Sequence, residues 1–455
     1  MEQLKMIKYI SDECGAGKTQ SIIKSINNST DINTKYLLVQ NTIKLIAETE
    51  KQFTCSCKVI TSEQYSNAFD TCVEYMTSTV IDRVTIITDK IFYKLPIELL
   101  KSFKIYVDDC VDFHQFDSIQ ILNDEHKLSV VREMFELKDK NFNGKYSVLK
   151  INNERDDLES LIKSKLERFA NMDRIYGNTS FFTDECDKDT RTLSVLGIID
   201  IEKYKDLDLD ITYLANDFEN TLLYKSNPAI FQKVEIALLE RSAPVSERLK
   251  VFYFLPNSTY NATWRDNNQN SYKQIIQYLN CNVSNYYWTG NNSDNVKLNG
   301  AYVPPQTRGV NSLTDYSTCI WLCSMKPSRA ESGILASLFG LTSEDIIQAR
   351  EIEMFRQFVM RGSIRKFDSA DEMIVYCVDE YQARQLSQTP TMIDIGLSMS
   401  HSEKVPALNT NQRKRISRFL AKNPSLIDFK NWLGQYKNSD LTVSQKQKLL
   451  KKFLN

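Results

Sequence analysis

Short apolar runs alternate with amphipathic stretches over the first 110 residues. The apolar runs that predict buried strands lie at 6–10, 36–39, 84–87 and 105–107. Between them, the stretches 19–26 and 42–52 space their apolar residues as a helix does. Continuous β-branched runs separated by helices are typical of a parallel sheet that is covered on both faces. This region is therefore predicted to be a doubly wound α/β domain.

A second α/β pattern begins near residue 248. Its predicted strands lie at 251–255, 283–288, 318–323 and 373–378. Residues 272–279 and 351–362 have helical spacing and connect these strands. The chain is therefore predicted to contain a second parallel sheet of the same class.

The segment between these patterns, residues 115–235, has a different character. It is more highly charged, and the stretches 124–135 and 153–171 show the apolar stripe of an amphipathic helix. We therefore expect a largely helical insertion in the first domain.

The charge distribution separates the end of the chain from the rest. The predicted domains are 1–245, 246–408 and a basic C-terminal region, 409–455. The whole chain has 57 Lys+Arg against 58 Asp+Glu, a net charge of −1. The last 47 residues contain eleven basic and two acidic residues, so they carry +9 and the remainder carries −10. A basic, helical C-terminal region of this kind favours a polyanionic partner.

Several classes of protein are disfavoured by the composition. The three histidines, His114, His126 and His401, lie far apart, which argues against a multi-histidine metal site. The ten cysteines are dispersed along a long chain, as is typical of a reducing compartment. No apolar run approaches the ~20 residues that span a bilayer, and the first residues do not resemble a secretory signal. We expect a cytoplasmic protein with no membrane partner.

The most specific motif is a glycine-rich loop, Gly15-Ala16-Gly17-Lys18-Thr19, between the first predicted strand and the first predicted helix. Glycines let the backbone turn tightly and point several N–H groups at a phosphate. The helix N-terminus adds positive potential. Lys18 would reach the β- and γ-phosphates of ATP, and the Thr19 hydroxyl would bind Mg²⁺. The loop predicts a nucleotide site.

Two acidic residues follow a later strand and complete this prediction. Asp108 and Asp109 come directly after the apolar run at 105–107. Asp108 would hold Mg²⁺, and Asp109 would orient or deprotonate the attacking water.

The loop, the acidic pair and the second α/β unit together resemble a superfamily 2 helicase, of the DEAD/DEAH-like kind found in phages and plasmids. Other segments follow in that family's order. The nucleic-acid contacts of the family resemble Gln40, Asn41 and Thr42, then Thr88, then Thr307 and Arg308. Its coupling motif resembles the segment with Ser242 and Ala243, although Pro244 stands at the third position.

The family's last motif resembles the segment 357–365. Gln357, Arg361 and Arg365 are its candidate catalytic residues. Arginines can stabilise charge that develops on the γ-phosphate. On a continuous helix, Arg361 and Arg365 are four residues apart and share a face. Either or both are predicted to act as arginine fingers.

The resemblance implies two RecA-like parallel-sheet P-loop domains in tandem that use ATP and Mg²⁺ to act on nucleic acid. The basic residues Arg413, Lys414, Arg415 and Arg418 are added as nucleic-acid contacts because of their density. On family grounds we expect DNA rather than RNA, a host cytoplasm if the protein is phage-encoded, and partners from replication or recombination.

Two alternatives remain open at this point. A genome-packaging ATPase combines similar motifs, but it should have clustered acids after the motor, where this chain is basic. A nucleotide-gated nucleic-acid-binding accessory protein without unwinding activity is also compatible with Asp109 in place of the family's Glu.

Overall fold

A computed structural model describes most of the chain. The described residues are 6–139, 144–151, 168–169, 171–183, 189–205, 209–294, 296–307, 310, 312–397, 410–421, 424–435, 441, 446, 449–450 and 453. They belong to two compact units. The larger unit is Met1–Asn267 with Lys273–Ile395, and the smaller is Asn268–Tyr272 with Gly396–Asn455.

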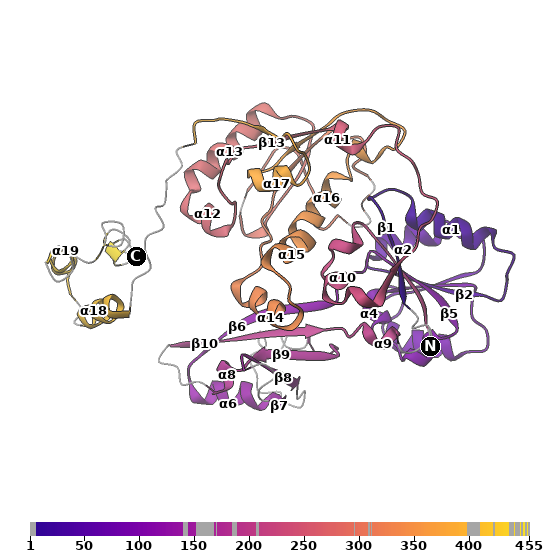
Figure 1. The fold of residues 1–455 in the computed structure, drawn as a ribbon, viewed down its shortest axis with the longest axis horizontal. Helices are drawn as coiled ribbons and strands as arrows, with labels where there is room; N and C mark the ends of the chain where they lie inside the picture. Colours follow the sequence, from indigo (N-terminus) through magenta and orange to yellow (C-terminus); the bar gives the residue numbers. More distant parts are fainter. Residues whose placement is uncertain are drawn as a thin grey trace. The chain divides into compact units, whose positions relative to one another are not determined.

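The first sheet of the larger unit has seven strands in the order β12-β1-β11-β5-β2-β4-β3 (Figure 1). Every pairing in it is parallel. Its strands are β1 (Ile7–Ser11), β2 (Lys35–Gln40), β3 (Cys57–Ile60), β4 (Val84–Thr88), β5 (Phe103–Asp108), β11 (Asp210–Ala215) and β12 (Phe231–Lys233). The helices described between its strands include α1 (Lys18–Asn28), α2 (Ile43–Glu50), α3 (Ala68–Thr77), α4 (Asp89–Phe92), α5 (Ile97–Leu100) and, between β11 and β12, α10 (Leu222–Ser226).

Both faces of this sheet are buried, which explains the uninterrupted apolar runs. In β2, Leu38 packs in one cluster with Ile22 of α1. The neighbouring residues Leu37 and Val39 pack in a different cluster on the opposite face. A strand that is covered on both faces needs apolar residues at every position. The prediction of a parallel α/β sheet is confirmed.

The segment after β5 forms a separate antiparallel sheet of five strands, in the order β6-β10-β9-β8-β7 (Figure 1). These strands are β6 (His114–Leu122), β7 (Phe135–Asp139), β8 (Tyr146–Ile151), β9 (Arg174–Asn178) and β10 (Thr190–Ile198). Among the described residues, α6 (Glu125–Glu133) and α8 (Ser180–Thr183) lie between these strands, and α9 (Glu202–Lys205) follows β10.

The prediction of a largely helical insertion over 115–235 is therefore wrong for the described residues. In β6 the buried Ile119 and Ile121 alternate with exposed polar residues, so the strand is as rich in polar residues as an amphipathic helix. The predicted helix at 124–135 is present as α6, whereas the helix predicted at 153–171 falls mostly outside the described residues. The insertion is also shorter than predicted, because β11 and β12 belong to the first sheet.

The second parallel sheet has six strands in the order β15-β14-β16-β17-β13-β18. They are β13 (Leu249–Tyr253), β14 (Tyr287–Gly290), β15 (Ala301–Tyr302), β16 (Thr318–Leu322), β17 (Met373–Tyr376) and β18 (Thr391–Met392). The helices that precede and connect them are α11 (Val245–Arg248), α12 (Ala262–Asn267), α13 (Gln269–Asn282), α14 (Arg329–Phe339), α15 (Ser343–Ile347), α16 (Glu353–Val359) and α17 (Glu380–Arg384). The prediction of a second parallel α/β sheet is confirmed.

The two parallel sheets are held in one unit by shared packing. Ile334 and Leu335 of α14 and Ile346 of α15 are fully buried in the same cluster as Leu196 of β10 and residues of the first sheet. A π-helical turn, Gln348–Ile352, then leads directly into α16. Helix α16 therefore begins from a segment that is anchored on the core of the first sheet.

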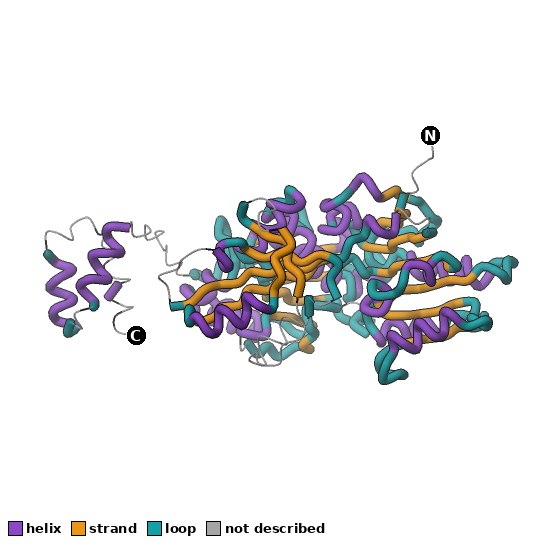
Figure 2. Tube along the Cα trace, turned by 90° about the horizontal axis from the view of Figure 1, so that it is seen from below, coloured by secondary structure: helices purple, strands orange, loops and turns teal. Residues whose placement is uncertain are grey.

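In the described part of the smaller unit, a basic helix and a neutral one form a core of their own. Helices α18 (Thr410–Leu420) and α19 (Leu426–Gly434) lie side by side (Figure 2). The rings of Phe419 and Trp432 stack at 4.6 Å between them. Ile416 and Phe429 are buried in the same cluster. The predicted basic helical C-terminal region is therefore present, and its aromatic residues form a core.

Candidate nucleotide-binding and catalytic site

The glycine-rich loop connects β1 to α1, as the sequence predicts. Gly15 and Gly17 have φ angles of +86° and +85°, a left-handed conformation that side chains disfavour. A Cβ on Gly15 would lie 3.3 Å from the Phe367 ring, and one on Gly17 would lie 3.3 Å from Leu239. Both glycines are therefore required by conformation and by close packing.

Lys18, the first residue of α1, is folded beneath this loop. Its Nζ donates hydrogen bonds to the backbone oxygens of Asp12, at 2.7 Å, and Glu13, at 2.8 Å. Only 9% of Lys18 is exposed. These carbonyls hold the ammonium group at the position from which it can reach an arriving phosphate.

Asp108 lies at the end of β5, beside the ends of β2 and β11. Its Oδ2 accepts hydrogen bonds from Thr19 Oγ1 and Gln40 Nε2, both at 2.9 Å. Burial raises the pKa of the Asp108 carboxyl to about 6, against the opposing effect of these hydrogen bonds and of Lys18.

The surroundings of Asp108 fit Mg²⁺. Carboxylate, hydroxyl and amide oxygens are the ligands that this ion prefers. Thr19 and Asp108 bring two such oxygens together, and the Oε1 of Gln40 is buried without a hydrogen-bond partner among the described residues. No group of three or more His, Cys, Asp or Glu residues that could hold a metal occurs in the described part of the chain.

Asp109 has an unusual backbone conformation for a residue with a side chain. Its φ is +58°, and its backbone N–H donates to Leu214 of β11 at 2.8 Å. Both oxygens of its carboxylate accept from Gln357 Nε2, at 3.3 Å each. Asp108 therefore contacts Thr19 of the glycine-rich loop, which we call the phosphate loop. Asp109 instead contacts α16, in the part of the larger unit that contains the second parallel sheet, which we call the second half.

Helix α16 makes further contacts with the end of β11. Asn216 donates to the Glu353 carboxylate at 2.6 Å, and Arg356 donates to Asp217 at 2.7 Å. The sequence analysis did not single out these four residues. The available signal was a polar Asn-Asp pair after the apolar run of β11, which resembles the acidic pair after β5.

Arg361 and Arg365 line the same cavity as Lys18, Thr19 and Asp108. This cavity has a volume of about 200 Å³, and Asp109 also lines it. Arg361 is 8% exposed, and its Nε has no hydrogen-bond partner among the described residues. The same holds for Nη1 of Arg365. Burial, reinforced by the charge of Arg361, lowers the pKa of Arg365. Buried guanidinium N–H groups without partners suit an incoming phosphate.

The two arginines do not share a helix, contrary to the prediction. Helix α16 ends at Val359, and Arg365 closes a 3-10 turn that begins at Ser363. Gly362 separates the two, and a Cβ there would lie 2.4 Å from Met373. The Met373 side chain packs against Gly362, and the turn after α16 brings both arginines to the cavity.

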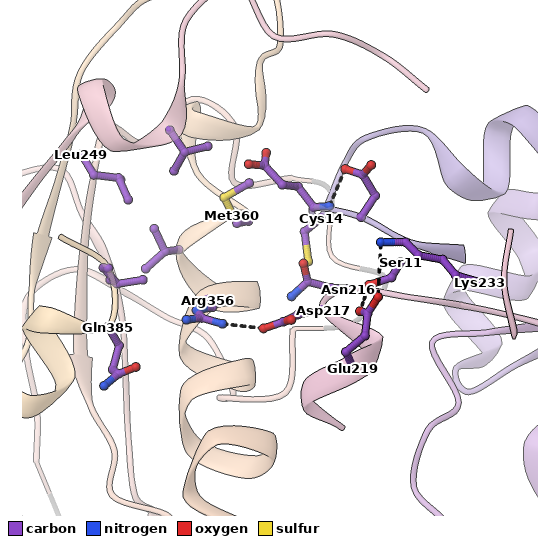
Figure 3. A pocket seen from close by; sticks show the side chains of 15 residues that line it. Ser11, Cys14, Asn216, Asp217, Glu219, Lys233, Leu249, Arg356, Met360 and Gln385 are labelled. Atoms are coloured by element: carbon purple, nitrogen blue, oxygen red, sulfur yellow. Dashed lines mark hydrogen bonds and ion pairs between the residues drawn. The ribbon is translucent and has the colours of Figure 1, made fainter. Parts of the chain in front are cut away.

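A second cavity, of about 520 Å³, adjoins the first through Cys14 and Asn216, which line both (Figure 3). The Arg356–Asp217 ion pair lies on its wall, and Met360 contributes apolar surface. This cavity separates β1 and β11 from α16. It lies beside the phosphate loop, of which Asp12, Glu13 and Cys14 line it.

The predicted nucleic-acid contacts are not brought together. Gln40 is fully buried, and its side-chain amide donates to Asp108. Asn41 donates to the backbone of Asp109 at 3.3 Å, and the side chain of Thr42 caps α2. Thr307 is 1% exposed.

The other predicted nucleic-acid contacts that the structure describes lie on separate elements. Thr88 stands before α4 and lies at the end of β4, next to β2. Arg308 lies outside the described residues. Of the predicted basic contacts, Arg413, Lys414 and Arg418 are exposed on α18 and Arg415 is half-buried.

The predicted coupling residues lie between the two parallel sheets. Ser242 donates its backbone N–H to Phe367 at 2.9 Å and its hydroxyl to Ser369 at 3.3 Å. Ala243 is half-buried. Ser242 therefore contacts the segment that follows the arginine turn.

No protein-family model matches the chain, and no curated protein matches it. Solved structures are similar over most of its length. One is described as XPD_Helicase, with 12% identity and a TM-score of 0.49, covering 86% of this chain and 96% of that one. S. cerevisiae Dbp5 bound to RNA and ADP BeF3 has 7% identity and a TM-score of 0.40, covering 86% and 85%. T4 UvsW has 10% identity and a TM-score of 0.24, covering 91% and 72%.

Identities and TM-scores this low assign no family, so functional inference rests on the contacts within the chain. Among the described residues, no helix has both the length and the apolar character that a membrane crossing requires.

Proposed function

We propose that this chain hydrolyses ATP to drive movement on nucleic acid, as a helicase or translocase. One observation carries the proposal: a single cavity is lined by Lys18, Thr19 and Asp108 from the first sheet and by Arg361 and Arg365 from the second half. Phosphate-binding groups from two α/β halves meet at one place. Hydrolysis at that place is therefore sensitive to the relative position of the two halves.

The first sheet binds the nucleotide phosphates. The backbone N–H groups of the loop and the N-terminus of α1 face the phosphates, and Lys18 exchanges its carbonyl partners for them. Thr19 and Asp108 would hold Mg²⁺, which supplies charge neutralisation between the phosphate groups.

Asp109 and Gln357 position the attacking water. The Asp109 carboxylate accepts a proton from the attacking water, and the Gln357 side-chain amide holds that carboxylate in place. Glu353 accepts a hydrogen bond of 2.6 Å from the same amide nitrogen, which fixes its orientation.

Arg361 and Arg365 stabilise the charge that develops on the transferred phosphoryl group. They act only when the halves are close enough, which links hydrolysis to domain movement. The half-buried and exposed basic residues of α18 add an anchor for the polyanion, and DNA is the proposed track.

The direct test measures ATP hydrolysis with and without single-stranded DNA, duplex DNA and RNA. We expect stimulation by at least one of these, with Lys18→Ala lowering turnover by at least about 100-fold while the circular dichroism spectrum stays unchanged. Lys24→Ala is the matched control, because Lys24 is an exposed lysine on the same helix.

The outcomes separate the candidate functions. Wild-type turnover in Lys18→Ala would show that the loop is not a phosphate site. Nucleotide binding without hydrolysis would favour a nucleotide-gated binding protein. Stimulated hydrolysis without strand displacement would identify a translocase.

A further inference from the structure

Arg241 occupies a position between the phosphate loop and the arginine turn, Ser363–Arg365. Its Nε donates to the Glu13 carboxylate at 2.6 Å, and its Nη1 donates to the backbone oxygen of Ile364 at 2.7 Å. Its guanidinium carbon lies 3.8 Å from the centre of the Phe367 ring. The side chain is 8% exposed. One guanidinium group therefore holds both the loop that binds the phosphates and the turn that presents the arginines.

The surrounding backbone supports the same connection. Leu239 donates its N–H to Ala16 in the phosphate loop at 3.0 Å. Ser242 donates to Phe367, immediately after the arginine turn. Arg241 lies between these two anchor points in the chain. The segment therefore touches the loop at one end and the turn at the other.

Contact between the loop and the turn is close at this point. A Cβ on Gly15 would lie 3.4 Å from Cγ of Arg365 and 3.3 Å from the ring of Phe367. Small displacements of the turn would therefore move Arg365 against the phosphate loop. A shift of about 1 Å in a catalytic group can change a rate by about 100-fold.

A second buried arginine, Arg248, also contacts the arginine turn but has only a structural role. It is 1% exposed and donates to the backbone oxygens of Ser363 and Lys366, and also to those of Ile364 and Asp371. All its partners belong to the second half, so it stabilises the shape of the turn. Arg241 differs because its carboxylate partner, Glu13, belongs to the phosphate loop.

We propose that Arg241 is a positioning residue that sets the place of Arg361 and Arg365 relative to the bound phosphates. The inference rests on the proposed ATP hydrolysis. Lys18 donates a hydrogen bond to the backbone oxygen of Glu13, and Arg241 donates one to the Glu13 carboxylate. Glu13 therefore connects the lysine that binds the phosphates to the arginine that holds the turn.

The test compares hydrolysis and binding in Arg241→Ala. We expect kcat to fall by about 10- to 100-fold while KM for ATP changes less than about 3-fold. The affinity for ADP should stay the same, whereas that for ADP with aluminium fluoride, which mimics the transferring phosphoryl group, should fall by a factor similar to kcat. Arg241→Lys should be intermediate, because an ammonium group cannot replace the planar fork and its ring contact.

Variants of the partner make the test independent of the folding of Arg241→Ala. Glu13 is half exposed, so Glu13→Ala should fold and should lower kcat in the same direction. The double variant should be no slower than Arg241→Ala alone, because both changes remove one interaction. Arg384→Ala is the control, because it removes an exposed arginine that pairs with Glu380 on α17.

The results discriminate between the two proposals. If the wild type hydrolyses ATP but Arg241→Ala keeps its kcat, the positioning role is wrong. Equal weakening of ADP and of ADP with aluminium fluoride would indicate a structural role and would overturn it as well. A wild-type protein that does not hydrolyse ATP would refute the proposed function, and with it this inference.

Discussion

Gln357 donates its side-chain amide to both carboxylate oxygens of Asp109, at 3.3 Å each, across 248 positions of sequence. The side chain of Gln357, on α16 of the second half, thus orients Asp109, which follows β5 of the first sheet. The contact is long for a hydrogen bond, as catalytic contacts often are before substrate binds. It joins the two halves at the point where the attacking water is expected.

Replacing Gln357 should therefore impair chemistry more than binding. In Gln357→Glu, a third carboxylate would stand beside Asp109 and Glu353, and repulsion would displace Asp109. We expect kcat to fall by about 100-fold, with ADP affinity within about 3-fold of wild type. Steady-state kinetics and ADP titration measure both. The control, Gln348→Ala on the π-helical turn, removes a partly buried Gln that contacts Glu344 and Tyr381, and should leave kcat unchanged.

The two cavity arginines give a second prediction. Arg361→Ala and Arg365→Ala should each lower kcat by at least about 100-fold, because each removes a positive group that stabilises the negative charge of the transition state. The larger loss identifies the finger. Arg356→Ala, on α16 before the arginine turn, removes a residue that faces Asp217 and the second cavity, and should cost about 10-fold or less. Near-normal turnover in both cavity variants would contradict the proposed role of the turn.

Local features were predictable from the sequence because they depend on neighbouring residues. The glycine loop needs left-handed backbone at Gly15 and Gly17, and the strands of the first sheet need apolar residues on both faces. Asp108 and Thr19 were placed together because the ends of parallel strands lie at one edge of a sheet. Each of these requirements concerns a short stretch of the chain, so the local sequence pattern predicts it.

Features that depend on distant neighbours were missed. Helix α16 ends at Val359, before Arg361, although the apolar spacing of 351–362 predicts a helix to residue 362. Gly362 packs there against Met373 of β17, 11 positions further along the chain. Gln40 is predicted as a nucleic-acid contact from the resemblance of its segment, and its hydrogen bond to Asp108, 68 residues away, is not visible in that segment. The insertion was predicted to be helical because a half-exposed antiparallel strand such as β6 is as polar as a surface helix.

The raised pKa of Asp108 predicts a dependence of stability on pH. Its pKa rises from 3.8 to about 6 in the folded, nucleotide-free protein. The folded state therefore retains a proton that the unfolded state releases between about pH 4 and 6, and stability falls as pH rises through this range. At pH 7.5 the buried charge costs about 3 kcal/mol.

Asp108→Asn should remove this cost. The nucleotide-free variant should melt at a higher temperature than wild type at pH 7.5, and the difference should vanish near pH 4. The new side chain in Asp108→Asn keeps an oxygen that accepts from Thr19. Its N–H group can donate to Oε1 of Gln40, which has no hydrogen-bond partner among the described residues. Differential scanning calorimetry at several pH values measures the effect, with the exposed Asp266→Asn on α12 as control. A variant that melts no higher than wild type at pH 7.5 would contradict the buried-charge explanation.

The basic face of α18 gives the last prediction. Arg413, Lys414 and Arg418 are exposed there, whereas Ile416 is buried in the core of the smaller unit. Changing the three basic residues together to Gln removes charge without disturbing that core. If each neutralises one phosphate, the slope of log affinity against log salt concentration should become shallower by about 2 to 3. Fluorescence anisotropy with labelled single-stranded DNA at 50–300 mM salt, roughly the range over which such contacts weaken, measures this slope.

Two comparisons make the result specific to this face. Removing residues 409–455 from the chain should flatten the slope at least as much as the triple variant, because it deletes all eleven basic residues of the region. The same number of charges removed elsewhere, by changing the exposed Lys24, Lys101 and Lys250 to Gln, should change the slope by less than about 1. An unchanged slope in the triple α18 variant would show that the polyanion binds elsewhere on the chain, since counterion release follows the charges that contact phosphates.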